Sequence, residues 1–312
     1  MRLRAPVAAG AAVLALAAAV IAGTTAPGAS WVVVPDAAFP AAMAALPAGA
    51  GGGFVYGERL TGRVMQVSGV TPDAPSSVTV FDRVDVSIEG EQRGLLGLAA
   101  DGSRIYAAWT EPTGRIVVGR LEGDGDPTLI WRGPASTDRA NGGHLEFAPD
   151  GSLVIGVGSL LDDVAARDPD TVNGKLLALD PDGPADQAPS VISGGWNNPF
   201  AFGYAPDGTL YVADNSGGDA PERLAIGNAG PSPEVLATWS AHTVASGLTV
   251  LDDAHLLVCT YLTRRLIPFT ISGSGAMPGL ARATDCSIGV IQLADGTLVY
   301  ANETELRGLS GD

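Results

Sequence analysis

One short phrase occurs three times along the chain and limits what it can fold into. It runs over Phe147–Gly156 (Phe-Ala-Pro-Asp-Gly-Ser-Leu-Val-Ile-Gly), over Tyr204–Ala213 (Tyr-Ala-Pro-Asp-Gly-Thr-Leu-Tyr-Val-Ala) and, shortened, over Leu293–Ala301 (Leu-Ala-Asp-Gly-Thr-Leu-Val-Tyr-Ala). Asp-Gly between alternating hydrophobic residues is a strong hairpin signal, and we expect both turn residues at positive φ. Hairpins that recur every few tens of residues predict a strand-built repeat architecture, such as the blades of a β-propeller.

Paired apolar runs divide the chain into six units. The units begin at Ala42, Leu95, His144, Phe200, Gly247 and Ile288. Each offers three or four short strands, but the last lacks an outer strand, whereas Trp31–Val34 precedes the first unit without a partner. In a closed propeller such a strand can complete the last blade and remove an exposed edge. We therefore predict an all-β, six-bladed β-propeller over residues 30–312, with a two-sheet sandwich as the alternative.

The N-terminus is typical of an export signal. Arg2 and Arg4 precede an apolar stretch over residues 7–22, and small residues follow over residues 23–30. This order predicts a signal peptide at residues 1–29, with an uncleaved membrane anchor as the alternative. We expect an exported protein, either secreted or held in the cell envelope, with no further contact with the membrane.

The charge of the chain excludes some partners. The formal net charge is −16, and it becomes −18 without residues 1–29, since that segment has two arginines and no acidic residue. An acidic surface repels phosphate, so we do not expect nucleic acid as a partner. We expect a monomer whose partner is a sugar-like small molecule or an extracellular protein.

Five segments between residues 89 and 224 carry a family resemblance. They are Glu91–Ala99 (Glu-Gln-Arg-Gly-Leu-Leu-Gly-Leu-Ala), Asn141–Gly151, Asn173–Gly183, Asn198–Gly203, and Val212–Asp219 with Glu222. In this order they resemble the soluble glucose/sorbosone dehydrogenases, which use pyrroloquinoline quinone (PQQ). The resemblance implies a six-bladed propeller that oxidises a sugar alcohol or an aldose with PQQ and Ca²⁺.

The resemblance also implies a set of site residues. The cofactor-binding positions are Gln92, Asn141, Asn197 and Asn198. The Ca²⁺ positions are Asp214, Ser216 and Gly217, the last two through backbone carbonyl groups that survive a change of side chain.

The sequence departs from the family at the general base and at the cationic positions that bind the cofactor. The family's general base is a His where this chain has Ala140, and alanine cannot take a proton. An arginine of the family falls on Asn197, and a lysine falls on Leu262 or, with a shift of one residue, on Thr263. Two further arginines fall on Cys286 and Ile288. Since PQQ is a tricarboxylate, we expect weak binding, and His144 is a candidate substitute base.

Two other functions stay open. One is a propeller without catalysis that binds a ligand or a protein. The other is a Ca²⁺-dependent hydrolase that resembles gluconolactonases, with Glu91, Asn141, Asn198 and Asp214 as metal ligands and the metal polarising a lactone carbonyl. Asn198 and Asp214 could equally cap turns. The charge that lines the central mouth separates these functions: cations favour PQQ, converging carboxylates favour a metal, and neither favours a binding protein.

The two cysteines and two further histidines are expected to have structural roles or to lie at the surface. Cys259 and Cys286 predict one disulfide in an exported chain, with buried thiols or a reactive or metal-binding pair as alternatives. Both cysteines and all the matched residues precede a first strand or follow a second one. We therefore expect them on one face, with the disulfide across the mouth. His242 and His255 belong to no motif and are expected at the surface or in structural roles.

Overall fold

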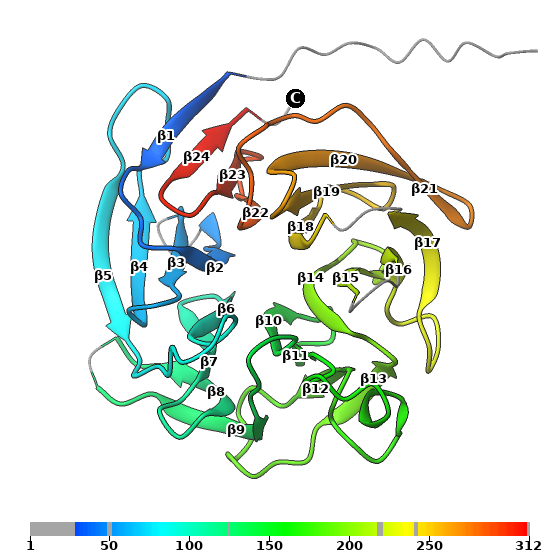
Figure 1. The fold of residues 1–312 in the computed structure, drawn as a ribbon. Coiled ribbons are helices and arrows are strands. Elements are labelled where there is room, and N and C mark those ends of the chain that lie inside the picture. The colour runs from blue at the N-terminus through cyan, green and yellow to red at the C-terminus, as the bar shows by residue number, and fades with distance from the viewer. Residues whose placement is uncertain (1–28, 49–51, 124, 217–220, 240–242, 311–312) are drawn as a thin grey trace, which may run out of the picture.

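The computed structural model describes residues 29–48, 52–123, 125–216, 221–239 and 243–310. Its strands form six antiparallel sheets of four strands each, arranged around a central axis (Figure 1). The prediction of an all-β, six-bladed propeller is confirmed, and the sandwich alternative is wrong. The predicted signal peptide and His242 lie outside the described residues. In the described part of the chain, no helix has the length and apolar character needed to cross a membrane.

Each blade is built outward from an innermost strand. Blade one contains β2 (Pro40–Ala45), β3 (Phe54–Glu58), β4 (Arg63–Ser68) and β5 (Ser77–Arg83). Blade two contains β6 (Leu95–Asp101), β7 (Arg104–Thr110), β8 (Arg115–Leu121) and β9 (Thr128–Ala135). Blade three contains β10 (Gly142–Phe147), β11 (Leu153–Val157), β12 (Lys175–Leu179) and β13 (Ser190–Gly194), with the 3-10 helix η2 (Ala165–Arg167) between β11 and β12.

The second half of the ring repeats this order. Blade four contains β14 (Asn198–Tyr204), β15 (Leu210–Asn215), β16 (Glu222–Ile226) and β17 (Glu234–Trp239). Blade five contains β18 (Ala245–Val250), β19 (His255–Thr260), β20 (Arg265–Ser272) and β21 (Gly275–Pro278). Blade six contains β22 (Gly289–Gln292), β23 (Leu298–Ala301) and β24 (Leu306–Leu309), and its outermost strand is β1 (Ser30–Val34).

The N-terminal strand closes the ring, as predicted. β1 pairs antiparallel with β24, with Trp31 opposite Gly308 and Val32 opposite Arg307. The segment Trp-Val-Val-Val is rich in β-branched residues, which suit a pleated strand with one buried face. The pairing removes the free edge that β24 would otherwise expose.

The repeated Asp-Gly phrase forms hairpins, but our expectation for its backbone is half wrong. Only the glycine has a positive φ, at 87° for Gly151, 89° for Gly208 and 87° for Gly296. The aspartate stays at negative φ and its carboxylate accepts the backbone N–H two residues on, as Asp207 does from Thr209 at 2.8 Å. The chain thus makes a type I turn followed by glycine in the left-handed region, which requires one such residue rather than two.

Apolar packing holds neighbouring blades together. Six buried clusters lie between the blades, and each joins one adjacent pair. Between blades two and three, for example, Tyr106 and Trp131 pack with Leu145 and Ile155. The cluster between blades six and one includes Val33 of the closing strand. The hydrophobic core is therefore a ring of interfaces between adjacent blades. It surrounds the central axis, so the ends of the axis are available for a site.

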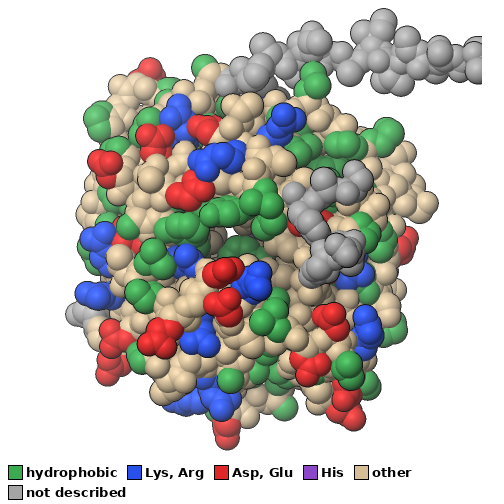
Figure 2. Space-filling view, viewed as in Figure 1, with side chains coloured by type: hydrophobic (Ala, Val, Ile, Leu, Met, Phe, Trp, Pro, Cys, Tyr) green, Lys and Arg blue, Asp and Glu red, His purple; other side chains and the backbone are tan. Residues whose placement is uncertain are grey.

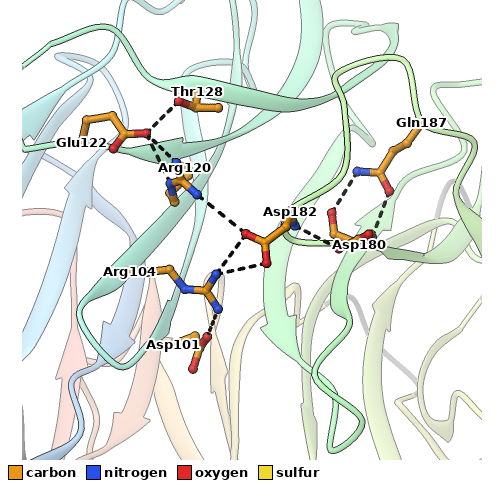
Figure 3. Close-up of polar contacts among 8 residues, drawn as sticks. All are labelled: Asp101, Arg104, Arg120, Glu122, Thr128, Asp180, Asp182 and Gln187. Carbon is orange, nitrogen blue, oxygen red and sulfur yellow. Dashed lines mark hydrogen bonds and ion pairs between the residues drawn. The ribbon is translucent and has the colours of Figure 1, made fainter.

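Polar contacts add to this packing at the surface. Figure 3 shows Asp182 of blade three facing two arginines of blade two, with Arg104 Nη1 at 3.0 Å and Arg120 Nη1 at 3.7 Å from its Oδ1. Arg104 also pairs with Asp101. Exposed ion pairs of this kind contribute at most about 1 kcal/mol each, so the apolar clusters dominate the stability.

Candidate functional site

A cavity of about 460 Å³ opens at one end of the central axis. We call it the mouth. All six blades contribute to its wall, through residues that include Arg59, Gln92, Gly142, Asn198, Tyr261 and Ile288. Figure 2 shows a hollow near the centre of this face, with hydrophobic side chains along one side and acidic and basic side chains along another. Its volume is typical of a site for a small molecule.

Two of the predicted residues line the mouth and brace it. The Gln92 side-chain oxygen accepts the Ala140 backbone N–H at 2.7 Å, and this bond links blade two to the loop before blade three. The Asn198 side-chain oxygen accepts the Gly142 N–H at 2.9 Å and links blade four to blade three. Since each side-chain oxygen accepts a backbone N–H, the NH₂ group of each amide remains as a possible donor to a ligand in the mouth.

Asn141 is buried and lies outside the mouth. Its NH₂ group donates to the backbone oxygens of Gln92 and Thr137, each at 2.9 Å. Its oxygen accepts the Thr137 N–H at 2.8 Å. These three bonds use the amide to hold the loop that precedes β10, so this side chain shapes the mouth from behind.

Three predicted residues lie on a second cavity. Asn197, Asp214 and Ser216 line a space of about 380 Å³ beside Trp196 and Arg223. The buried Asp214 carboxylate accepts the N–H groups of Asn197 and Asn198 at 3.1 and 2.8 Å and pairs with Arg223 at 2.9 Å. Burial raises the pKa of Asp214, while Arg223 and the two N–H groups oppose that rise.

The predicted metal ligands are divided in the same way. Glu91 and Asn198 line the mouth, Asn141 is buried behind it, and Asp214 faces the second cavity. Glu91 is largely exposed and lies 3.6 Å from Arg139. Within the described ranges, no group of three or more His, Cys, Asp or Glu side chains could hold a metal. Gly217 lies outside those ranges, so a Ca²⁺ ion on its backbone stays a prediction.

Ala140, at the position of the family's base, and His144, the candidate substitute, do not lie in the same place along the central axis. Ala140 is buried, with φ at 55°. His144 instead lines a deeper cavity of about 220 Å³ between the innermost strands, together with Glu146. The His144 ring has Nε2 3.0 Å from the Phe202 carbonyl oxygen, and burial lowers its pKa to about 4. Burial raises the pKa of Glu146 to about 7.

The positions aligned with the family's cations give the mouth no charge. Cys286 is bonded to Cys259, which confirms the predicted disulfide, and their Cα atoms are 5.5 Å apart. The bond joins blade five to the segment before β22 of the neighbouring blade, and both cysteines are buried, so it does not cross the mouth. Ile288 contributes an apolar wall, and the Thr263 hydroxyl bonds to Thr260 at 2.7 Å. Leu262 is exposed.

Sequence reasoning missed several residues of the mouth. Arg59 follows β3 and is the one Lys or Arg among the described residues that line the cavity. Asn215 ends β15, and its side-chain oxygen is buried without a hydrogen-bond partner. Phe39 and Phe200 add aromatic surface. Arg59 and Asn215 could have been found from their place at the end of a second strand, since Arg59 directly follows β3 and Asn215 is the last residue of β15. His255 is exposed beside Asp252, as expected.

The structure defines a six-bladed propeller with a cavity at one end of its central axis. The family model for Glucose / Sorbosone dehydrogenase matches residues 37–228, so the chain belongs to that family. No curated protein matches the sequence.

Solved structures share the fold at low identity. A putative oxidoreductase (glucose dehydrogenase) from Thermus thermophilus is 21% identical, with a TM-score of 0.77 over 90% of this chain and 99% of that one. The PQQ-bound aldose sugar dehydrogenase of Streptomyces coelicolor is 22% identical, with a TM-score of 0.72 over 91% and 98%. The soluble aldose sugar dehydrogenase of Escherichia coli is 20% identical, with a TM-score of 0.75 over 91% and 99%.

Proposed function

We propose that this chain is a binding propeller that holds a sugar-like small molecule in its mouth and does not carry out PQQ-dependent oxidation. The observation that carries the proposal is the chemistry of the mouth wall. Aliphatic and aromatic side chains alternate there with uncharged amide and hydroxyl groups, and Arg59 and Glu91 are its only charged residues in the described part of the chain. Such a wall suits an uncharged or weakly charged polyhydroxylated molecule better than a highly charged cofactor.

The residues present do not fit PQQ. Its three carboxylates need several cationic partners, because a charge removed from water without a partner is costly. Arg59 alone offers such a charge, while the aligned positions carry a disulfide cysteine and an isoleucine. Ala140 has no proton acceptor, and the low pKa of His144, about 4, makes its imidazole a weak base. The described residues therefore supply neither the charge partners nor the base that PQQ-dependent oxidation needs.

The same wall offers partners for hydroxyl groups. Gln92 and Asn198 present amide donors, and Asn215 presents an acceptor without a partner. The rings of Phe39 and Phe200 can cover the apolar C–H faces of a sugar. A cavity of about 460 Å³ is large enough for such a ligand.

We place this function outside the cytoplasm, in a monomer. The Cys259–Cys286 disulfide supports export, because such bonds persist in oxidising compartments. The net charge of −16 supports a soluble surface that avoids nucleic acid. Size-exclusion chromatography with light scattering on the exported protein tests the monomer.

Thermal shift of the purified protein separates the three functions. We expect no saturable shift with PQQ and Ca²⁺, and a saturable shift with members of a panel of aldoses, alditols and sugar acids. A ligand at a hundredfold excess over its Kd stabilises by about 2.7 kcal/mol, which is readily measured. Saturable PQQ binding together with sugar oxidation by an artificial acceptor would replace our proposal by the dehydrogenase. A shift with Ca²⁺ alone, together with lactone hydrolysis, would replace it by the hydrolase.

A further inference from the structure

Arg59 is held on the mouth wall by contacts that use only part of its guanidinium. The group lies over the Phe39 ring, with its carbon 4.4 Å from the ring centroid. Its Nη1 donates to the backbone oxygen of Glu91 at 2.5 Å and lies 3.4 Å from that of Arg93. Blade one thereby contacts the loop before blade two, and the plane of the guanidinium is set.

The opposite edge of the same guanidinium has no partner. Nε is buried without a hydrogen bond, and Nη2 makes none to the residues that the structure describes. No described carboxylate lies within ion-pair distance of Arg59. The Nε–H and Nη2–H groups form the edge that pairs side-on with a carboxylate. Burial also lowers the pKa of Arg59, as expected for a cation that lacks a counter-charge.

On the opposite side of the ring from Arg59, Asn215 provides an unpaired hydrogen-bond acceptor. Asn215 ends β15 in blade four, and blades one and four lie opposite each other in the ring (Figure 1). Asn215 lines the same cavity, and its side-chain oxygen is buried and has no hydrogen-bond partner. A buried acceptor of this kind is satisfied when a ligand donates a hydroxyl proton to it.

We propose that the mouth is selective for a sugar acid with a single carboxylate, which Arg59 binds while a hydroxyl of the ligand donates to Asn215. This inference rests on the proposed function and names the ligand class of that site. A neutral sugar leaves the Arg59 edge without an acceptor of opposite charge. A phosphorylated sugar brings a second negative charge, and the only other charged group on the described wall is the carboxylate of Glu91.

Isothermal titration calorimetry at low salt tests the selectivity. The probes are sodium gluconate and sodium glucuronate, with glucose and glucitol as their neutral counterparts. We expect at least one acid to bind tenfold or more tightly than its neutral counterpart. Arg59→Gln should bring the ratio of acid affinity to neutral-sugar affinity close to one, whatever it does to the affinity for the neutral sugar itself. Arg139→Gln is the matched control, since it removes a nearby charge that does not line the cavity; it should keep the preference.

A second variant of Arg59 distinguishes a loss of selectivity from a loss of folding. Arg59→Lys keeps a positive charge and much of the packing on Phe39, but it lacks the two-pronged edge. We expect it to lose most of the preference for the acid while its thermal unfolding stays close to that of the wild type. Equal binding of acids and neutral sugars, unchanged in Arg59→Gln, would overturn the sugar-acid inference and leave the proposed function standing. Failure of all four probes to bind would overturn both.

Discussion

Gly208 shows how one residue can set a turn of this fold. Its φ is 89°, and a Cβ added there would meet no heavy atom within 4 Å. The need for glycine is therefore purely conformational. The repeated Asp-Gly phrase predicted the position of the hairpin for this reason, although it did not reveal that aspartate keeps a negative φ.

We predict that Gly208→Ala destabilises the fold by about 1–2 kcal/mol, the cost of placing an L-residue in the left-handed region. Gly230→Ala is the matched control, because Gly230 has open space around it and no positive φ. The control should be neutral or stabilise by about 0.4–1 kcal/mol, since alanine restricts the unfolded chain. Urea denaturation measures both variants. Equal midpoints would show that the turn tolerates alanine.

At the scale of the element, β10 carries two titratable groups into the central channel. His144 and Glu146 lie two residues apart and so point to the same side of the strand. Both line the deeper cavity, where removal from water favours the uncharged form of each group. Their effects on stability have opposite signs. Folded His144 has a pKa of about 4, below its ordinary value of 6.5. Folded Glu146 has a pKa of about 7, above its ordinary value of 4.5.

We predict opposite pH profiles for two variants of this strand. In Glu146→Gln only the histidine remains, and the unfolded state binds its proton more readily, so stability should rise from about pH 4 to 6.5. In His144→Gln only the glutamate remains, and the folded state keeps its proton, so stability should fall from about pH 4.5 to 7. Each slope is at most about 1.4 kcal/mol per pH unit.

Urea denaturation across pH 4 to 8 measures these profiles. In the wild type the two contributions oppose each other between about pH 4.5 and 6.5, so its profile should be flatter than that of either variant. A double variant with both substitutions serves as the baseline for all other groups. If both single variants follow the double variant, neither side chain titrates differently in the folded and unfolded states.

For the whole molecule, ring closure depends on β1. Val33 and Val34 are both 4% exposed and pack into the cluster between blades six and one. Without them, Leu306 and Leu309 of β24 would lose the strand that covers their edge.

We predict that deletion of residues 2–34 costs about 3–6 kcal/mol, since burial of each valine contributes about 1.5–3 kcal/mol. The exposed β24 edge should also promote aggregation. Deletion of residues 2–28 is the matched control, because it keeps β1 and should leave the free energy of unfolding of the propeller unchanged. Urea denaturation and light scattering compare the two. A truncation to residue 35 that stays monomeric and equally stable would show that closure by β1 is dispensable.

The sequence allowed much of the fold to be predicted, but less of the mouth. Blade-forming hairpins were visible because their inner strands are buried, as in Leu153–Val157. The outer strand Ser77–Arg83 is a weaker signal, because Val78 and Val80 alternate with polar residues but are themselves exposed and form no buried face. Gln92 and Asn198 were found through family motifs. Arg59 was missed because it lies outside the five matched segments, and Asn215 was missed because the segment Val212–Asp219 implied no role for it.

The pairing of β1 with β24 also has a consequence for how the protein is made. Residues 30–34 leave the ribosome before any of the blades, whereas their partners at 306–309 follow blades one to five. Blades one to five can each complete their own sheet as soon as their four strands have emerged. The first strand has no partner until all five of these blades have emerged, so a nascent chain interrupted before residue 306 has a propeller that is not yet closed.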